Sequence, residues 1–144
     1  SKHQDRLELQ KSNKGLYLIA RYNKSPVGHV FISWKGVDPK ISGKNFNCPN
    51  LEDLFVSPAH RSSGVGTKLI KECIRMAKQK GFSRVGLGVE KTNLKAAKLY
   101  SKFKFKEYWS YDDEWYGKDR KGNQTGPFSA SVKYFISPII NAED

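Results

Sequence analysis

Cysteine is scarce in this chain of 144 residues, and Cys48 and Cys73 belong to no CxxC pattern and have no paired histidine. They predict neither a zinc site nor a disulfide framework, so we expect no bound metal. Long apolar runs are also lacking, since none approaches the roughly 20 residues that span a bilayer. The opening stretch SKHQDRLELQ is polar and does not resemble a secretory signal. We therefore expect reduced thiols in a cytoplasmic protein without a membrane partner.

Acidic residues are few beside basic ones: 26 Lys and Arg face 14 Asp and Glu, which gives a net charge of +12. The excess is concentrated between Arg61 and Lys106, where 13 basic residues accompany only Glu72 and Glu90. Such a segment favours a polyanionic partner, either nucleic acid, a membrane surface or a phosphorylated cofactor. The alternative interpretation is a helix face that lysine keeps in water.

Apolar patterning predicts a mixed α/β fold in one domain over 1–144. Helical spacing predicts a helix from Gly64 to a stop at Gly81 and a second helix from an Asn93 cap to Phe103. Segment 35–49 contains several Gly and Pro residues and predicts a loop. The expected β segments are a hairpin over 15–34 and strands over 51–56, 85–89, 105–116 and 130–137.

One stretch has the pattern of an anion site. Arg61, Gly64 and Gly66 form R-x-x-G-x-G and lead directly into the long predicted helix. The first N–H groups of a helix lack partners and carry partial positive charge, and glycines let a ligand approach the backbone. Two other phosphate motifs do not fit, because Thr67-Lys68 reverses the P-loop order and Leu69 stands where a dinucleotide fingerprint needs a third glycine.

In its context this pattern resembles the GNAT superfamily of N-acetyltransferases. Leu-Phe-Val-Ser-Pro at 54–58 precedes the glycines, and Asn93-x-x-Ala96-x-x-Leu99-Tyr100-x-x-Phe103-x-Phe105 is similar to the family's second conserved block. The resemblance implies a central twisted mixed sheet with splayed strands, flanked by helices. It also implies acetyl-CoA as the cosubstrate.

The resemblance further implies which residues contact the cofactor. The splayed strand would bind the pantetheine arm, and the loop before the helix would hold the pyrophosphate. Tyr100 would be the acid that protonates the leaving thiolate, although a buried structural tyrosine is the alternative. The expected cofactor-binding residues are Leu54, Phe55, Val56, Arg61, Ser62, Ser63, Gly64, Val65, Gly66, Thr67, Asn93 and Lys98.

The second catalytic candidate is a carboxylate, because only a neutral amine attacks a thioester and a positioned base removes its proton. Glu52 and Asp53 lie on the strand beside the expected thioester, and strand alternation sends them to opposite faces. We favour Glu52, because polyamine-type acetyltransferases look similar over 51–56; a strand-end salt bridge is the alternative. A strand N–H, of Phe55 or Val56, would meet the oxyanion.

Two positions depart from the family pattern. Lys104 stands where the family usually has glycine between two aromatic residues, so this turn either strains a left-handed conformation or ends the helix differently. Only 14 residues precede the first predicted hairpin, whereas the family begins with a further strand and one or two helices. We therefore expect these N-terminal elements to be short or missing.

Asp112-Asp113-Glu114, between aromatic residues, suggests attraction of a cationic amine, and a polar hairpin edge is the alternative. The sequence thus predicts an acetyl-CoA-dependent N-acetyltransferase that acts directly on a primary amine of a small molecule or a protein. No acetyl-enzyme is expected, because Cys73 lies on the apolar helix face. Apolar segment 134–140 is either core or a homodimer contact.

Two other functions are compatible with the sequence. One is a cofactor sensor without activity. The other is a non-catalytic nucleic-acid- or ribosome-associated module, whose phosphate-contacting face would be Lys68, Lys71, Arg75, Lys78, Lys95, Lys98 and Lys102.

Overall fold

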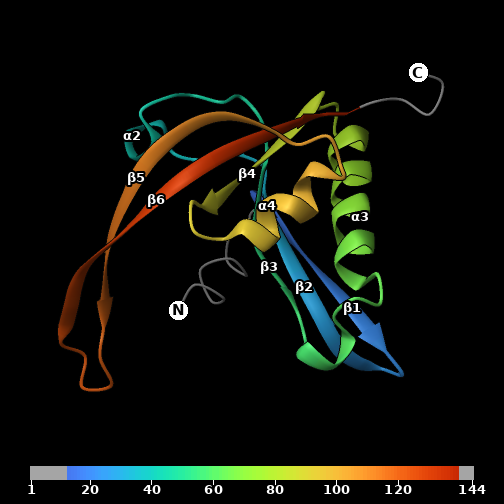
Figure 1. Ribbon diagram of the computed structural model, residues 1–144, viewed down its shortest axis with the longest axis horizontal. Helices are drawn as coiled ribbons and strands as arrows, with labels where there is room; N and C mark the ends of the chain where they lie inside the picture. The colour runs from blue at the N-terminus through green and yellow to red at the C-terminus, as the bar shows by residue number, and fades with distance from the viewer. Residues whose placement is uncertain (1–12, 140–144) are drawn as a thin grey trace.

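The computed structural model describes residues 13–139, in which six strands form one twisted mixed sheet (Figure 1). The strand order is β1-β2-β3-β4-β6-β5, and only β3 and β4 run parallel. The mixed α/β fold expected from the sequence is confirmed. The strands are β1 (Gly15–Tyr22), β2 (Ser25–Ser33), β3 (Asn50–Val56), β4 (Arg84–Glu90), β5 (Lys106–Lys118) and β6 (Gln124–Pro138).

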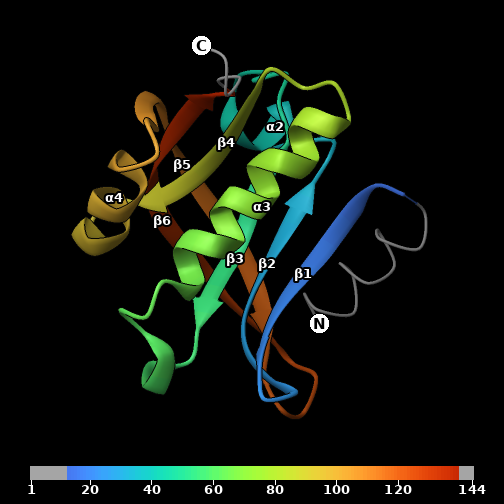
Figure 2. The same ribbon diagram turned by 90° about the vertical axis from the view of Figure 1, so that its right-hand side faces the viewer.

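Helix α3 (Val65–Gln79) crosses one face of the sheet, over β1 to β4 (Figure 2). It begins after Gly64, whose φ of 88° is left-handed, and Gly81 follows its end with a φ of 90°. The two predicted boundaries are therefore confirmed. Helix α4 (Leu94–Ser101) follows β4 and is capped by Asn93.

The core lies on both faces of the sheet. Under α3, Ile70 and Cys73 are fully buried and pack with the inward side chains of β2, β3 and β4. On the opposite face, Tyr134 stacks on Phe46 at 3.8 Å between ring centroids. Because Tyr134 and Phe135 are both buried, the core interpretation of this segment is confirmed for them. Position 140 lies outside the described residues, and the dimer contact stays a prediction.

Two predicted segments differ from the structure. Segment 35–49 contains the short helix α2 (Pro39–Ser42), because Asp38 accepts a hydrogen bond from the Lys40 N–H and Pro39 stands at the first helical position. Strand β6 begins at Gln124 rather than near 130, because pairing with β5 continues down to Lys118 opposite Gln124. The two strands form a long arm that extends beyond the rest of the sheet (Figure 1).

A bulge interrupts β3 where the candidate site begins. Asp53 and Leu54 together lie opposite Val30 of β2, between the pairs Phe31–Glu52 and His29–Phe55. Asp53 adopts a left-handed φ of 56°. This extra residue breaks the alternation that was expected to separate Glu52 from Asp53, and both now border the same cavity. The expectation that the two acids belong to opposite faces of a regular strand is therefore wrong.

The predicted polar lead-in over 1–14 lies almost wholly outside the described residues. The same is true of the further N-terminal elements that were expected to be short or missing.

Candidate active site

Strands β3 and β4 diverge soon after they meet. They pair only at Asn50 with Gly86 and at Leu51 with Leu87, so among residues 13–139 this edge of β3 has no strand partner from Glu52 onward. Two cavities occupy the gap, of about 570 and 850 Å³. Four residues line both of them, namely Leu54, Asn93, Ala96 and Tyr100. The gap is therefore one continuous cleft with two halves, and the splayed strands expected from the sequence are confirmed.

The larger half is lined by the loop before α3 and by one side of α4. Arg61 is fixed there, because its Nε donates a 3.0 Å hydrogen bond to the Val56 carbonyl. Lys95 approaches from α4 and Lys102 from the residue that follows its end, and no Asp or Glu is among the described residues that line this half. Unpaired N–H groups of the first turn of α3 add partial positive charge. We call this half the cationic half.

Glycine suits the two loop positions, 64 and 66, for different physical reasons. Gly64 has a left-handed backbone that L-residues avoid. Gly66 has an ordinary backbone, and a Cβ placed there would meet only the Val56 side chain, at 3.6 Å. A side chain would thus fit the protein and would project into the space beside the first helical turn. The open backbone, the helix start and the cations together fit the diphosphate of coenzyme A.

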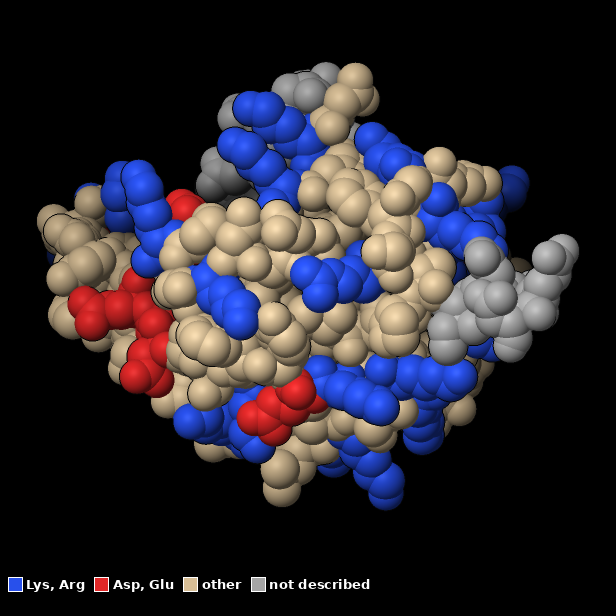
Figure 3. Space-filling view, turned by 90° about the horizontal axis from the view of Figure 1, so that it is seen from above, with Lys and Arg blue, Asp and Glu red and all other residues tan. Residues whose placement is uncertain are grey.

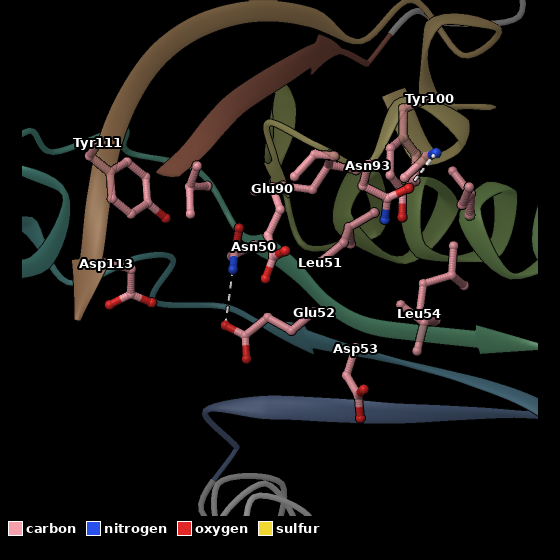
Figure 4. Close-up of a pocket in the computed structure, with 17 residues that line it drawn as sticks. Asn50, Leu51, Glu52, Asp53, Leu54, Glu90, Asn93, Tyr100, Tyr111 and Asp113 are labelled. Carbon is pink, nitrogen blue, oxygen red and sulfur yellow. Dashed lines mark hydrogen bonds between the residues drawn. The ribbon is translucent and has the colours of Figure 1, made fainter. Parts of the chain in front are cut away.

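The smaller half, which we call the acidic half, is bordered by Glu52, Asp53, Glu90 and Asp113 (Figure 4). Among its described lining residues there is no Lys, Arg or His. Asn50 lies beside Glu52 and donates a 3.0 Å hydrogen bond from Nδ2 to Oε2. Burial raises the pKa of the Tyr111 hydroxyl, and the carboxylates of Asp113 and Glu52 raise it further. Tyr111, Glu52 and Asp113 therefore lie close enough together for the two carboxylates to act on the hydroxyl.

Asn93 and Tyr100 stand where the two halves join (Figure 4). The Asn93 Oδ1 accepts a 3.1 Å hydrogen bond from the Ala96 N–H, as the predicted cap requires. Burial raises the pKa of Tyr100 to about 12, with a smaller contribution from Cys73. Tyr100 consequently keeps its proton at neutral pH and can act as a donor. Its ring is held edge-on against Phe105, with 5.8 Å between centroids.

The structure brings most of the predicted cofactor-binding residues together. Ser63 instead lines a neighbouring cavity, and its hydroxyl donates to the His60 carbonyl. Lys98 lines neither half of the cleft. The predicted residues that line the cationic half are Leu54, Phe55, Val56, Arg61, Ser62, Gly64, Val65, Gly66, Thr67 and Asn93.

Sequence reasoning missed several lining residues. Lys95 and Leu99 of α4, and Lys102 just after its end, lie on one side because they are four and three residues apart, a spacing that could have indicated them. Asn50 stands two residues before Glu52, so strand alternation could have placed it on the same face. Nothing local marks Glu90, which reaches the cleft only through the pairing of the sheet.

The acidic triplet of β5 divides between the two faces of the strand. Tyr111 and Asp113 face the cleft. Asp112 points to the other face and accepts a 2.8 Å hydrogen bond from the Ser131 hydroxyl, and Glu114 is exposed. Of the three acids, Asp113 alone borders the cavity.

The basic side chains do not form one continuous stripe on the face seen in Figure 3, where uncharged surface separates them. Within residues 13–139, no group of three or more His, Cys, Asp and Glu side chains could hold a metal ion. In the same range, no helix combines the length and the apolar character needed to cross a membrane.

Comparisons with known proteins agree with this architecture. The model of the acetyltransferase (GNAT) family matches residues 1–105. Mouse thialysine N-epsilon-acetyltransferase is 46% identical over 50 residues, which are 35% of this chain and 29% of the mouse protein. The match thus spans less than a third of that relative.

Solved structures show the same fold at low identity. An N-acetyltransferase from Staphylococcus aureus Mu50 has a TM-score of 0.69 and 18% identity, over 95% of this chain and 75% of the other. The PaiA N-acetyltransferase from Thermoplasma acidophilum, solved in complex with coenzyme A, has a TM-score of 0.65 and 18% identity, over 95% and 69% of the two chains.

Proposed function

The chain belongs to the GNAT family of acetyltransferases, and from this we propose that it transfers an acetyl group from acetyl-CoA directly to a primary amine of a small molecule or a protein. The observation that carries the proposal is the cleft between β3 and β4, which is cationic at one end and acidic at the other. A phosphate-rich cosubstrate and an ammonium-bearing acceptor would enter from opposite sides. Tyr100 lines both halves and stands where they would meet.

In the cationic half, Arg61, Lys95, Lys102 and the first turn of α3 would bind the phosphates. The unpaired edge of β3 offers backbone groups from Glu52 to Val56 for the pantetheine arm. The Asn93 amide nitrogen faces the same junction. When bound, acetyl-CoA supplies a thioester carbonyl that an amine can attack.

In the acidic half, Glu52 would take the proton of the attacking amine. Holding a lysine-like amine in its neutral form at pH 7 costs about 4.6 kcal/mol, so a nearby base is needed. The N–H of Phe55 or Val56 would donate to the developing oxyanion, which is worth about 3 kcal/mol. Tyr100 would donate its proton toward the leaving sulfur, since its raised pKa keeps the hydroxyl intact.

Direct transfer is also supported by the state of the cysteines. Cys73 is fully buried under α3, and burial raises its pKa to about 12, so it is a poor nucleophile. Cys48 is buried on the other face of the sheet. Two free, buried thiols are compatible with a reducing, cytoplasmic location, which we include in the proposal.

The test is a panel of primary amines assayed for release of free coenzyme A, with Glu52→Gln and Tyr100→Phe beside the wild type. We expect each variant to lower kcat by about a hundredfold while the affinity for acetyl-CoA is kept. Acetyl-CoA at a hundredfold excess over its Kd should raise the free energy of unfolding by about 2.7 kcal/mol. Unchanged kcat in both variants would contradict the catalytic roles of Glu52 and Tyr100.

The same experiment addresses the nucleic-acid module. Three of the basic side chains of segment 61–106 line the cationic half. Binding of acetyl-CoA would therefore explain part of the positive charge of this segment without a nucleic-acid partner. A module of that kind would bind RNA with a steep salt dependence and would gain little stability from acetyl-CoA. An inert sensor would gain stability without releasing coenzyme A.

A further inference from the structure

The acidic half holds more negative charge than one amine requires. Four of the 14 acidic residues of a chain with net charge +12 border this one cavity. Asp53 is paired with His29, with 3.2 Å between Oδ2 and Nε2, whereas within residues 13–139 neither Glu90 nor Asp113 forms an ion pair. A single ammonium ion beside Glu52 would leave these other two carboxylates without a counter-charge. Like charges around one cavity repel one another, and a ligand with a second cation relieves that repulsion.

Asn50 gives an independent indication of a ligand. Its side chain is only 7% exposed, and its Oδ1 is a buried atom without a hydrogen-bond partner among the described residues. The Nδ2 of the same amide is occupied by Glu52. The remaining group is therefore a carbonyl oxygen, which accepts hydrogen bonds and cannot donate one. An N–H donor of a molecule bound in the cavity would satisfy this buried acceptor.

The cavity extends away from Glu52 toward strand β5. Tyr111 and Asp113 are two residues apart and share the face that borders the cavity (Figure 4). Gly88 of β4 leaves room for Val132, because a Cβ there would lie 2.9 Å from the Val132 Cγ1, and the Tyr111 hydroxyl lies close by, at 3.5 Å from the same position. Asp113 and Glu52 both raise the pKa of Tyr111, so both carboxylates lie near its hydroxyl.

We propose that the acceptor is a diamine. Its reacting amine lies at Glu52 and donates an N–H to the Asn50 Oδ1, and its second ammonium group is bound by Asp113. This inference rests on the proposed function and specifies its acceptor. Asp113 and Glu52 come from β5 and β3, so the register of the sheet sets the spacing between the two amines. Glu90, from β4, adds attraction for both amines.

The test compares 1,5-diaminopentane with n-pentylamine, which lacks only the second amine. Equilibrium binding is measured in the presence of coenzyme A, so that no turnover occurs. We expect the diamine to bind at least about tenfold more tightly than the monoamine, in line with one charge-assisted contact. Asp113→Asn should reduce this ratio to less than about threefold, because it should weaken binding of the diamine more than binding of the monoamine.

Asp112→Asn is the matched control, because it removes the same charge one residue away on the opposite face of β5. It should keep the preference of the wild type. Should Asp113→Asn fail to fold, wild-type binding between about 0.05 and 0.5 M salt replaces it, and salt should weaken the diamine more than the monoamine. Equal binding of the two amines, or equal effects of the two Asn variants, would overturn the inference.

Failure of this inference is distinguishable from failure of the proposed function. Coenzyme A release with saturating n-pentylamine reports the transfer reaction alone. Release of coenzyme A without tighter binding of the diamine would contradict the second-cation site, while the proposed acetyltransferase activity would be supported. No release with any amine, together with no stabilisation by acetyl-CoA, would remove the proposed function itself.

Discussion

The Asn50 Nδ2 donates a 3.0 Å hydrogen bond to the Glu52 Oε2, and both side chains belong to β3 with one residue between them. Side chains two apart on a strand share a face, so this bond holds the carboxylate within the acidic half of the cleft. Because Asn50 is buried, the geometry of the pair is restricted. We interpret Asn50 as a positioning residue that acts through Glu52.

Asn50→Ala should lower kcat by about tenfold, because a lost hydrogen bond to a charged group leaves Glu52 less well oriented. The Kd for acetyl-CoA should not change, since Asn50 does not line the cationic half. In a Glu52→Gln background, Asn50→Ala should have little further effect on kcat. Additive losses in this double-mutant cycle would contradict the positioning role.

Gly66→Ala separates stability from binding. A Cβ at this position meets only Val56, at 3.6 Å, and alanine is a better helix former than glycine. The free energy of unfolding should therefore stay constant or rise by up to about 1 kcal/mol. The affinity for acetyl-CoA should fall by about tenfold, because the methyl group occupies the space beside the first helical turn. Calorimetry and thermal unfolding measure the two quantities.

Gly122→Ala is the control for that prediction. Gly122 has a left-handed φ of 84° in the turn between β5 and β6, away from the cleft. The Gly122→Ala variant should lose about 1 to 2 kcal/mol of stability and keep the affinity of the wild type for acetyl-CoA. The prediction fails if Gly66→Ala behaves in the same way.

Lys104 adopts a left-handed conformation with a φ of 65°. Of the two outcomes expected at this departure from the family pattern, the structure has the strained left-handed turn. Lys104→Gly should therefore stabilise the protein by about 1 kcal/mol. Lys102 has an ordinary helical backbone, with a φ of −66°, so Lys102→Gly should destabilise it by about 0.5 to 1 kcal/mol. Melting temperatures of the two variants should move in opposite directions.

Alkaline pH should reduce stability through Cys73. Burial raises its pKa from 9.0 to about 12, so above pH 9 the unfolded chain loses a proton that the folded chain keeps. The stabilisation is thus complete below pH 9 and decreases as pH rises toward 12, by about 1.4 kcal/mol per pH unit.

Urea unfolding between about pH 9.5 and 11 measures this slope. Cys73→Ala should lower the slope by about one proton, whatever its effect on absolute stability. Val85→Ala is the control, because it opens a cavity in the same core cluster and removes no titrating group. Equal slopes in the wild type and Cys73→Ala would refute the prediction.

The sequence by itself determined the features that depend on neighbours along the chain. The anion loop at Arg61, Gly64 and Gly66 follows from glycines placed before an amphipathic helix, because helix starts and left-handed turns are local properties. The Asn93 cap and the boundaries of α3 follow in the same way.

The acceptor half of the cleft was decided by the tertiary structure. Glu52, Glu90 and Asp113 come from three strands, and only the pairing of the sheet brings them to one cavity. The bulge at Asp53 brings it to the side of Glu52, and the register of β5 against β6 turns Asp113 rather than Asp112 inward. Strand side chains alternate, so a shift of one residue would reverse each choice, and no local pattern specifies that register.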